Sequence, residues 1–289
     1  LGREDGDAAE AVLTSLRDQD GVNVALSTKA LRCEGADNDN RGSGTLVCER
    51  DGEEVRFEFD ALLLALDRRA NSNTAGIKDI GIEIAKNGTV ASDPFLRTNY
   101  PSVSVSGDVA GPYQFTHVAA HQAWYAAVNS LLRPFWSFRA DYGVIPWCTF
   151  TSPEVARVGL NETEAKERGI EVEVTRYDIG DLDRAITDGE AHGFVKVLTT
   201  PGSDDILGAT IVGVHAGELI AEFVLAMKHD LGLDELLGTI HVYPTMMEAN
   251  KYAAGNWKRA NKPEKLLRYA ARYFAWRRGR PATRGSEQT

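Results

Sequence analysis

Three extended segments followed by two helical ones constrain the second half of this 289-residue chain most strongly. Strand patterns rich in Val, Ile and Thr cover residues 172–178, 193–199 and 206–214. Apolar residues at helical spacing then cover 216–229 and 245–260. Strands that precede helices in this way, rather than alternating with them, predict an α+β domain of ordinary size, which we place at residues 141–262.

The first 69 residues show a different pattern. Residues 7–18 place Ala8, Val12 and Leu16 four apart, which predicts a surface helix. Short extended runs follow at 22–26, 29–34, 45–50 and 54–59, with a mobile hairpin loop expected at 35–44. The continuous apolar run ALLLAL at 61–66 is typical of a parallel strand that is covered on both faces. Together these segments predict the closing portion of an α/β nucleotide-binding domain whose start is missing.

Residues 70–140 form a third region. Residues 70–98 are rich in loop-forming residues and include one short strand at 89–92. A second short strand, 103–106, ends at Gly107 and Asp108, and residues 116–132 have helical spacing. This part of the chain therefore predicts a strand-turn-helix unit.

The remaining residues, 263–289, contain a predicted basic amphipathic helix at 263–280. Its apolar stripe comprises Leu267, Ala270, Ala271 and Phe274, with five Lys and Arg residues around it. Packing of this stripe against the protein itself or a dimer mate is favoured over contact with a membrane surface or another partner.

Composition excludes several classes of function. The net charge of -10 disfavours DNA, RNA or an anionic membrane as the main partner. The sequence has no apolar run of about 18 residues and no signal peptide at its start. Cys33, Cys48 and Cys148 lack the spacing of a disulfide framework or a zinc site, so we expect no metal and reduced thiols in a cytoplasmic protein. Because residue 1 is Leu, we expect processing or truncation at the N-terminus.

Two motifs resemble flavin-binding segments of the glutathione reductase and dihydrolipoamide dehydrogenase superfamily. The resemblance implies that residues 1–69 are the C-terminal part of its NAD(P)-binding domain and residues 70–140 the C-terminal part of its FAD-binding domain. In SVSVSGDVAG, Gly107 permits close backbone approach and Asp108 is an acceptor for a sugar-like hydroxyl of FAD. PYQFTHVAAHQA resembles the segment in which a helix N-terminus faces the flavin ring. The resemblance implies flavin contacts from the backbone of Phe115, Thr116 and His117, where the positive end of the helix stabilises electron density. For the His117 side chain, a capping or core role is favoured over direct chemistry.

From Pro146 onwards the sequence resembles the dimerisation domain of this superfamily. In IHVYPTMMEANKYA, Tyr243 stands where disulfide-reducing members have an acid/base His, and Glu248 matches the Glu that orients it. With Pro244 as the first helical residue, we expect a hydrogen bond between Tyr243 and Glu248. His241 is expected to be a structural histidine, because alternation points it away from Tyr243.

A phenol with an ordinary pKa near 10 is a poor base at neutral pH, so lipoamide or glutathione turnover is disfavoured. Tyr at this position resembles mercuric reductases and soluble transhydrogenases. The vicinal C-terminal cysteines of classical mercuric reductases are absent from the sequence, however.

The resemblance implies part of a homodimeric class I pyridine nucleotide-disulfide oxidoreductase that uses FAD and NAD(P)H. Hydride would pass from NAD(P)H to flavin and then to a metal, quinone-like, disulfide or nicotinamide acceptor. The sequence has neither a GxGxxG motif nor a CxxxxC pair, so we expect the chain alone to be inactive. The competing interpretation is a non-catalytic dimerisation or interaction module that retains the C-terminal fold.

Overall fold

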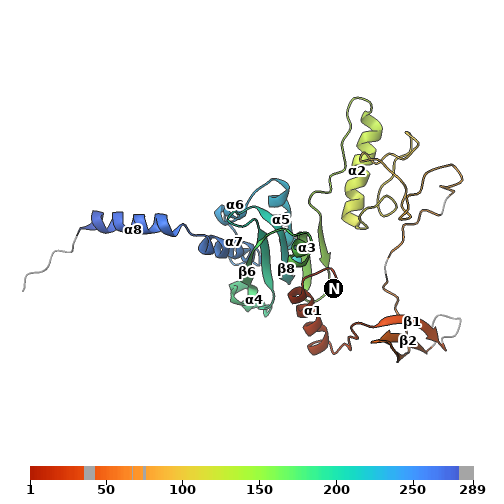
Figure 1. Cartoon of the computed structure of the whole chain (residues 1–289), viewed down its shortest axis with the longest axis horizontal. Helices are drawn as coiled ribbons and strands as arrows, with labels where there is room; N and C mark the ends of the chain where they lie inside the picture. Colours follow the sequence, from red (N-terminus) through yellow and green to blue (C-terminus); the bar gives the residue numbers. More distant parts are fainter. Residues whose placement is uncertain (36–42, 67, 74–75, 280–289) are drawn as a thin grey trace, which may run out of the picture. The chain divides into compact units, whose positions relative to one another are not determined.

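The chain forms two compact units in the computed structural model, which describes residues 1–35, 43–66, 68–73 and 76–279. One unit comprises Leu1–Ala11 with Cys148–Thr289, and the other comprises Val12–Trp147 (Figure 1). The helix α1 (Gly6–Asp18), which confirms the helix predicted at residues 7–18, crosses the boundary between them. The division of the sequence into four regions, 1–69, 70–140, 141–262 and 263–289, stays a prediction.

The larger unit is built on a five-stranded sheet in the order β4-β5-β8-β7-β6. The helix α5 packs against β5 and β8, and α7 packs against β6 and β7 (Figure 1). This arrangement confirms the predicted α+β domain. The elements are β4 (Pro146–Thr149), β5 (Glu154–Gly159), α3 (Glu162–Glu167), β6 (Glu173–Asp178), η1 (Ile179–Asp181), α4 (Asp183–Asp188), β7 (Phe194–Thr199), β8 (Ile206–Gly213), α5 (Ala216–Lys228), α6 (Leu233–Gly238), α7 (Glu248–Ala260) and α8 (Glu264–Arg278).

One face of this sheet carries a row of polar side chains in the middle of otherwise apolar strands. Thr210 on β8 is paired with Arg157 on β5 and with Lys196 on β7, in register across three antiparallel strands. Lys196 is in turn paired with Arg176 on β6. Because side chains alternate along a strand, the four residues share one face, and all but Arg176 are buried.

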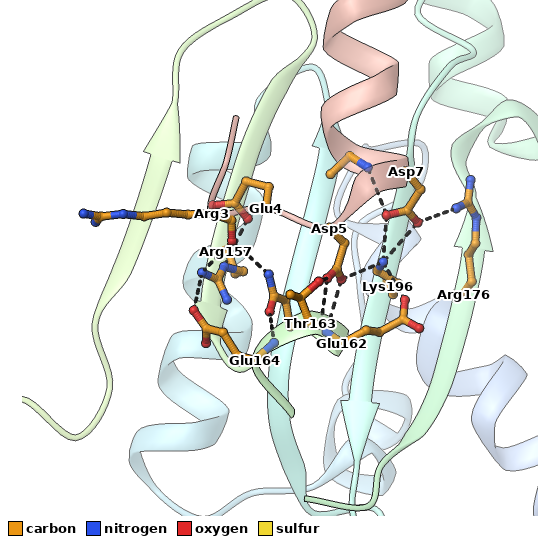
Figure 2. Close-up of polar contacts among 12 residues, drawn as sticks. Arg3, Glu4, Asp5, Asp7, Arg157, Glu162, Thr163, Glu164, Arg176 and Lys196 are labelled. Carbon is orange, nitrogen blue, oxygen red and sulfur yellow. Dashed lines mark hydrogen bonds and ion pairs between the residues drawn. The ribbon is translucent and has the colours of Figure 1, made fainter. Parts of the chain in front are cut away.

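The acidic N-terminal segment covers this polar row. Lys196 Nζ lies 2.9 Å from a carboxylate oxygen of Asp5, 2.8 Å from one of Asp7 and 2.8 Å from one of Glu162 (Figure 2). Its side chain is only 2% exposed. A buried ammonium requires such compensation, because desolvation strongly disfavours an unpaired charge.

The N-terminal segment also compensates the buried charge of Arg157. Its guanidinium lies 3.1 Å from a carboxylate oxygen of Glu4 and 2.9 Å from one of Glu164 (Figure 2). It also donates to the carbonyl of Arg3, at 3.3 Å, and the Asn161 side chain donates to the same carbonyl at 3.0 Å. The N-terminal segment is therefore an integral part of the larger unit.

The smaller unit contains an antiparallel sheet, a helix and a small apolar core. The sheet has the order β1 (Lys29–Glu34), β2 (Gly44–Arg50), β3 (Glu53–Phe59), which confirms three of the predicted strands. The helix α2 (Thr116–Leu132) has the predicted bounds. The core consists of Ile82, Val90 and Val105. Single bridges at Val90 and Ser104 replace the short strands that we expected there.

Two strand predictions in this unit are wrong. Residues 22–26 have no strand structure, and neither do residues 61–66. Instead of lying between two layers, Leu63 and Leu66 are 88% and 79% exposed. The reason is that a strand needs a neighbour for its backbone hydrogen bonds, and the described sheet pairs only β1, β2 and β3. Most of the hairpin loop predicted at 35–44 lies outside the described residues.

Candidate functional site

The Gly107–Asp108 turn is fixed by a buried glutamine on α2. The Gly107 N–H donates to Gln122 Oε1 at 2.6 Å, and Gln122 Nε2 donates to the Gly111 carbonyl at 2.7 Å. Gly107 has a φ of +80°, which only glycine adopts without strain, and a Cβ there would lie 3.4 Å from Ala119. Gln122 thus ties the turn to the helix that follows it, a link that we did not predict from the sequence.

Asp108 presents its carboxylate at the surface beside this turn. Its side chain is 43% exposed and lies 3.9 Å from a guanidinium nitrogen of Arg68. The same guanidinium donates to the Gln114 carbonyl, at 3.4 Å, just before α2 begins. The Asp108 carboxylate is therefore accessible to a hydroxyl donor. It lies close to Arg68, which also contacts the residue before the N-cap of α2.

The N-terminus of α2 is open in the described part of the chain. Phe115 is its N-cap residue, and no side chain caps the first turn. Thr116 and His117 at this end are exposed. The free N–H groups of a first helical turn attract negative charge, so this end favours an electron-rich ligand edge.

His117 has a structural role different from the expected one. Its ring stacks on Phe115, with centroids 5.2 Å apart, and Nε2 lies 2.9 Å from the Pro146 carbonyl oxygen. The residue is exposed and does not cap the helix, so both the core and the capping interpretation are wrong. Instead, His117 joins the start of α2 to Pro146, the first residue of β4.

These residues fit the group that the resemblance implies. The positive φ of Gly107, the accessible Asp108 carboxylate and the uncapped helix end are what an FAD ribityl chain and flavin ring would require. All five residues named for flavin contact lie in the smaller unit.

The two predicted catalytic residues lie in the larger unit, but the bond predicted between them is wrong. The Tyr243 hydroxyl donates to Asp183 Oδ2, at 2.9 Å, and not to Glu248. The helix α7 begins at Glu248, so Pro244 is not its first residue and Tyr243 is not at its cap. The irregular segment in between sends Tyr243 towards α4.

Glu248 instead accepts hydrogen bonds from the backbone before its helix and from a second tyrosine. It is buried, and it accepts hydrogen bonds from the Thr245 N–H at 3.3 Å and from the Tyr252 hydroxyl at 3.5 Å. The Tyr252 ring packs against Tyr177, with centroids 5.3 Å apart. Burial, with the negative charge of neighbouring groups, raises the pKa of Tyr177 to about 12.

Asp183 makes Tyr243 a proton donor. The hydrogen bond to the Asp183 carboxylate, reinforced by its charge, raises the pKa of the Tyr243 phenol above its ordinary value. The side chain of Tyr243 remains exposed in the single chain. Sequence reasoning missed Asp183, because nothing in the pattern connects two residues 60 positions apart.

His241 is a satisfied structural histidine, as predicted. Its Nε2 lies 2.8 Å from a Glu222 carboxylate oxygen and its Nδ1 lies 3.0 Å from the Thr239 carbonyl oxygen. The side chain is 3% exposed, so it has no access to solvent in the single chain.

The three cysteines are free thiols in different surroundings. Cys33 is exposed, Cys48 is buried and Cys148 is intermediate. Burial, and to a smaller extent the negative charge of Glu154, raises the pKa of the Cys148 thiol to about 11. Within the described residues, no three His, Cys, Asp or Glu side chains are grouped as metal ligands would be. None of the helices found there is long and apolar enough to cross a membrane.

Two family models match most of the chain. Residues 1–123 match the model described as "Pyridine nucleotide-disulphide oxidoreductase", and residues 145–254 match "Pyridine nucleotide-disulphide oxidoreductase, dimerisation domain". The second match confirms the dimerisation domain expected in this part of the sequence.

Individual proteins are similar over the same region. The chain is 36% identical to a dihydrolipoyl dehydrogenase of Chlamydia muridarum, over 72% of this chain and 45% of the relative. It is 32% identical to that of Bacillus subtilis, over 81% of this chain and 50% of the relative. The solved structure of the HOCl-induced flavoprotein disulfide reductase RclA from Escherichia coli has a TM-score of 0.76 and 26% identity, covering 88% of this chain and 56% of that one. The chain thus spans about half the length of the relatives that it matches.

Proposed function

Because the chain belongs to the pyridine nucleotide-disulphide oxidoreductase family, we propose that it forms the flavin-facing turn and the dimerisation domain of a homodimeric FAD-dependent oxidoreductase. When bound there, FAD would supply hydride transfer from NAD(P)H and onward electron transfer to a small-molecule acceptor. The observation that carries this proposal is the Gly107–Asp108 turn, which Gln122 attaches to α2, the helix whose N-terminus is open in the described residues.

Each group in the flavin-facing turn has a separate task. The Asp108 carboxylate would accept a hydrogen bond from a ribityl hydroxyl, and Gly107 would leave room for the chain of the cofactor. The free N–H groups at Phe115, Thr116 and His117 would stabilise negative charge on the ring. All of these are binding and electrostatic roles, and none of them requires the His117 side chain.

Exposed apolar side chains support a homodimer. Ile240 and Val242, on either side of the buried His241, are 94% and 74% exposed in the dimerisation domain. Exposed apolar side chains that form a contiguous patch are typical of a surface that another protein covers. In the proposed dimer, a second copy covers them and brings Tyr243 to the flavin-adjacent site of its partner.

The Tyr243–Asp183 pair narrows the choice of acceptor. A phenol whose pKa is raised donates a hydrogen bond at neutral pH and does not remove a proton from a thiol. Of the acceptors considered, a metal ion, a quinone-like compound or a nicotinamide therefore fits better than an ordinary disulfide. We place the enzyme in the cytoplasm, where the three free thiols would stay reduced.

Isolation of the polypeptide as its cell makes it, through an affinity tag, tests the proposal. Intact mass and N-terminal sequencing define the chain, and visible absorbance shows whether flavin is bound. We expect a yellow protein that contains further residues and reduces a dye with NAD(P)H. The 289-residue chain alone is expected to be inactive. A colourless, stably dimeric 289-residue product would instead support the non-catalytic dimerisation module.

Two substitutions test the role of Tyr243 in that intact enzyme. Tyr243→His restores an imidazole and should raise thiol–disulfide turnover if the partner site keeps a cysteine pair. Asp183→Asn, the matched control, removes the charge that orients the phenol but introduces no base, so it should not raise this turnover. Equal effects of the two variants, or no effect of Tyr243→His, would contradict the assignment.

A further inference from the structure

The helix α8 lies outside the segment that the family shares. The dimerisation-domain match ends at residue 254, whereas α8 covers Glu264–Arg278. No residue of α8 is buried by the described part of the chain. Packing against its own chain, one of the two arrangements favoured from the sequence, is therefore wrong for these residues.

Three of the five basic residues of α8 share one side of its axis, whereas Arg277 and Arg278, in the last turn, fall on the side of the apolar stripe. At about 100° per residue, Lys265, Arg268 and Arg272 fall within an arc of about 60°. The opposite side carries an apolar stripe that includes Leu266, Leu267 and Phe274, of which Leu266 is 64% exposed. Three aromatic residues lie between the basic arc and the apolar stripe: Tyr269, Tyr273 and Trp276.

Charge distinguishes α8 from the rest of the protein. The whole chain has a net charge of -10, but α8 contains five Lys and Arg residues and a single acidic residue, Glu264. Two of the five, Arg277 and Arg278, are in the last turn, where long side chains reach out from an apolar surface. A helix with this composition attracts anionic surfaces although the protein as a whole repels them.

We propose that α8 binds the surface of a membrane that contains anionic phospholipids. The apolar stripe would enter the boundary between headgroups and acyl chains, and the basic arc would pair with lipid phosphates. The aromatic residues between them match the depth at which amphipathic rings settle in a bilayer.

A membrane satisfies both sides of the helix at once. An acidic surface of a second copy could attract the basic arc, but the apolar stripe on the opposite side would then stay in water. A second copy that covered the apolar stripe would leave the basic arc hydrated in solvent, where it would add nothing to the binding. The proposal does not depend on flavin binding or on catalysis.

Co-sedimentation of the 289-residue chain with phospholipid vesicles tests this inference. We expect binding to phosphatidylcholine vesicles that contain phosphatidylglycerol, little binding to phosphatidylcholine alone, and a decrease with added salt. Phe274→Glu should abolish binding, and Arg268→Glu with Arg272→Glu should weaken it at least about tenfold. A matched double charge reversal at the C-terminal end of α3, Lys166→Glu with the C-cap substitution Arg168→Glu, should leave binding unchanged.

Because α8 has no buried residue, these variants should keep the secondary structure of the parent, which circular dichroism checks. Three results would overturn the proposal. They are a lack of binding to anionic vesicles, equal binding to neutral ones, or a change of sedimentation coefficient in Phe274→Glu without any loss of lipid binding. The last result would assign the apolar stripe to a second copy of the chain.

Discussion

Lys196 Nζ lies 2.8 Å from Asp7 Oδ1, although the two residues stand 189 positions apart in the sequence. This contact fastens the beginning of the chain to the middle strands of the five-stranded sheet (Figure 2). Lys196 is one of two cations buried on that face, and both are compensated by carboxylates of the same N-terminal segment. Docking of this segment and stability of the sheet are therefore coupled.

Lys196→Met should destabilise the larger unit by about 3 kcal/mol, because it leaves Asp5 as a buried carboxylate without its cation. Urea unfolding followed by hydrogen exchange of the β7 and β8 amides measures this unit alone. The matched control is Lys258→Met, which removes an exposed ion pair to Asp234 and should cost less than about 1 kcal/mol. Equal losses of unfolding free energy in the two variants would contradict the prediction that the buried ion pairs contribute more than an exposed one.

The same cluster predicts a loss of stability in acid. Burial alone would raise the pKa of Asp5, but hydrogen bonds from Lys196, Thr163 and the Glu162 N–H outweigh it and lower the pKa below its ordinary value. A carboxyl with a lowered pKa in the folded state stabilises that state above about pH 4, and this contribution is lost as the pH falls through the folded-state pKa. The free energy of unfolding should therefore drop below about pH 4.

Asp5→Asn isolates this contribution from that of the other carboxylates. The variant should be less stable than the parent at neutral pH, and the difference should shrink as the pH falls below about 4. Denaturant unfolding at several pH values measures it. A difference that does not depend on pH would mean that Asp5 acts through its hydrogen bonds and not through its charge.

The sequence predicted the elements of this sheet better than the contacts that secure it. The alternating strands and the helices at 216–229 and 245–260 could be recognised because burial on one face imposes a period. The pairing of Lys196 with the N-terminus could not, since it depends on how strands far apart in sequence align. The signal in the sequence was a charged residue within an apolar strand, as in GFVKVLTT and PEVARVGL.

The strand predicted at residues 61–66 is wrong for the opposite reason. Its apolar composition is that of a strand with two covered faces, but no described strand is paired with it. At the site, the α2 bounds and the Gly107 turn followed from local patterns, whereas Gln122 and Asp183 act over distances that no local pattern encodes. Local propensity thus predicts helices and turns, whereas the partner of Tyr243 depends on tertiary contacts.

The thiols should differ sharply in reactivity. With a pKa of about 11, Cys148 is thiolate in only about one molecule in a thousand at pH 8, whereas Cys33 is exposed. Titration with a disulfide reagent should show one fast thiol, which Cys33→Ser removes. Glu154→Gln removes a negative charge beside Cys148, so it should speed the reaction of Cys148. A fast phase that persists in Cys33→Ser would contradict these assignments.

Gln122→Leu should loosen the Gly107–Asp108 turn without melting α2. The Gly107 N–H would lose its 2.6 Å bond, and the buried Gly111 carbonyl would lose the donor that Gln122 supplies, at a cost of about 1–3 kcal/mol. Hydrogen exchange at the Gly107 amide measures the effect locally, with Gln114→Leu as an exchange control outside this network. Faster exchange at Gly107 with unchanged protection in the middle of α2 is expected. If the amide stays protected, the Gln122 hydrogen bond is not what protects it, and Gln122 only fills space.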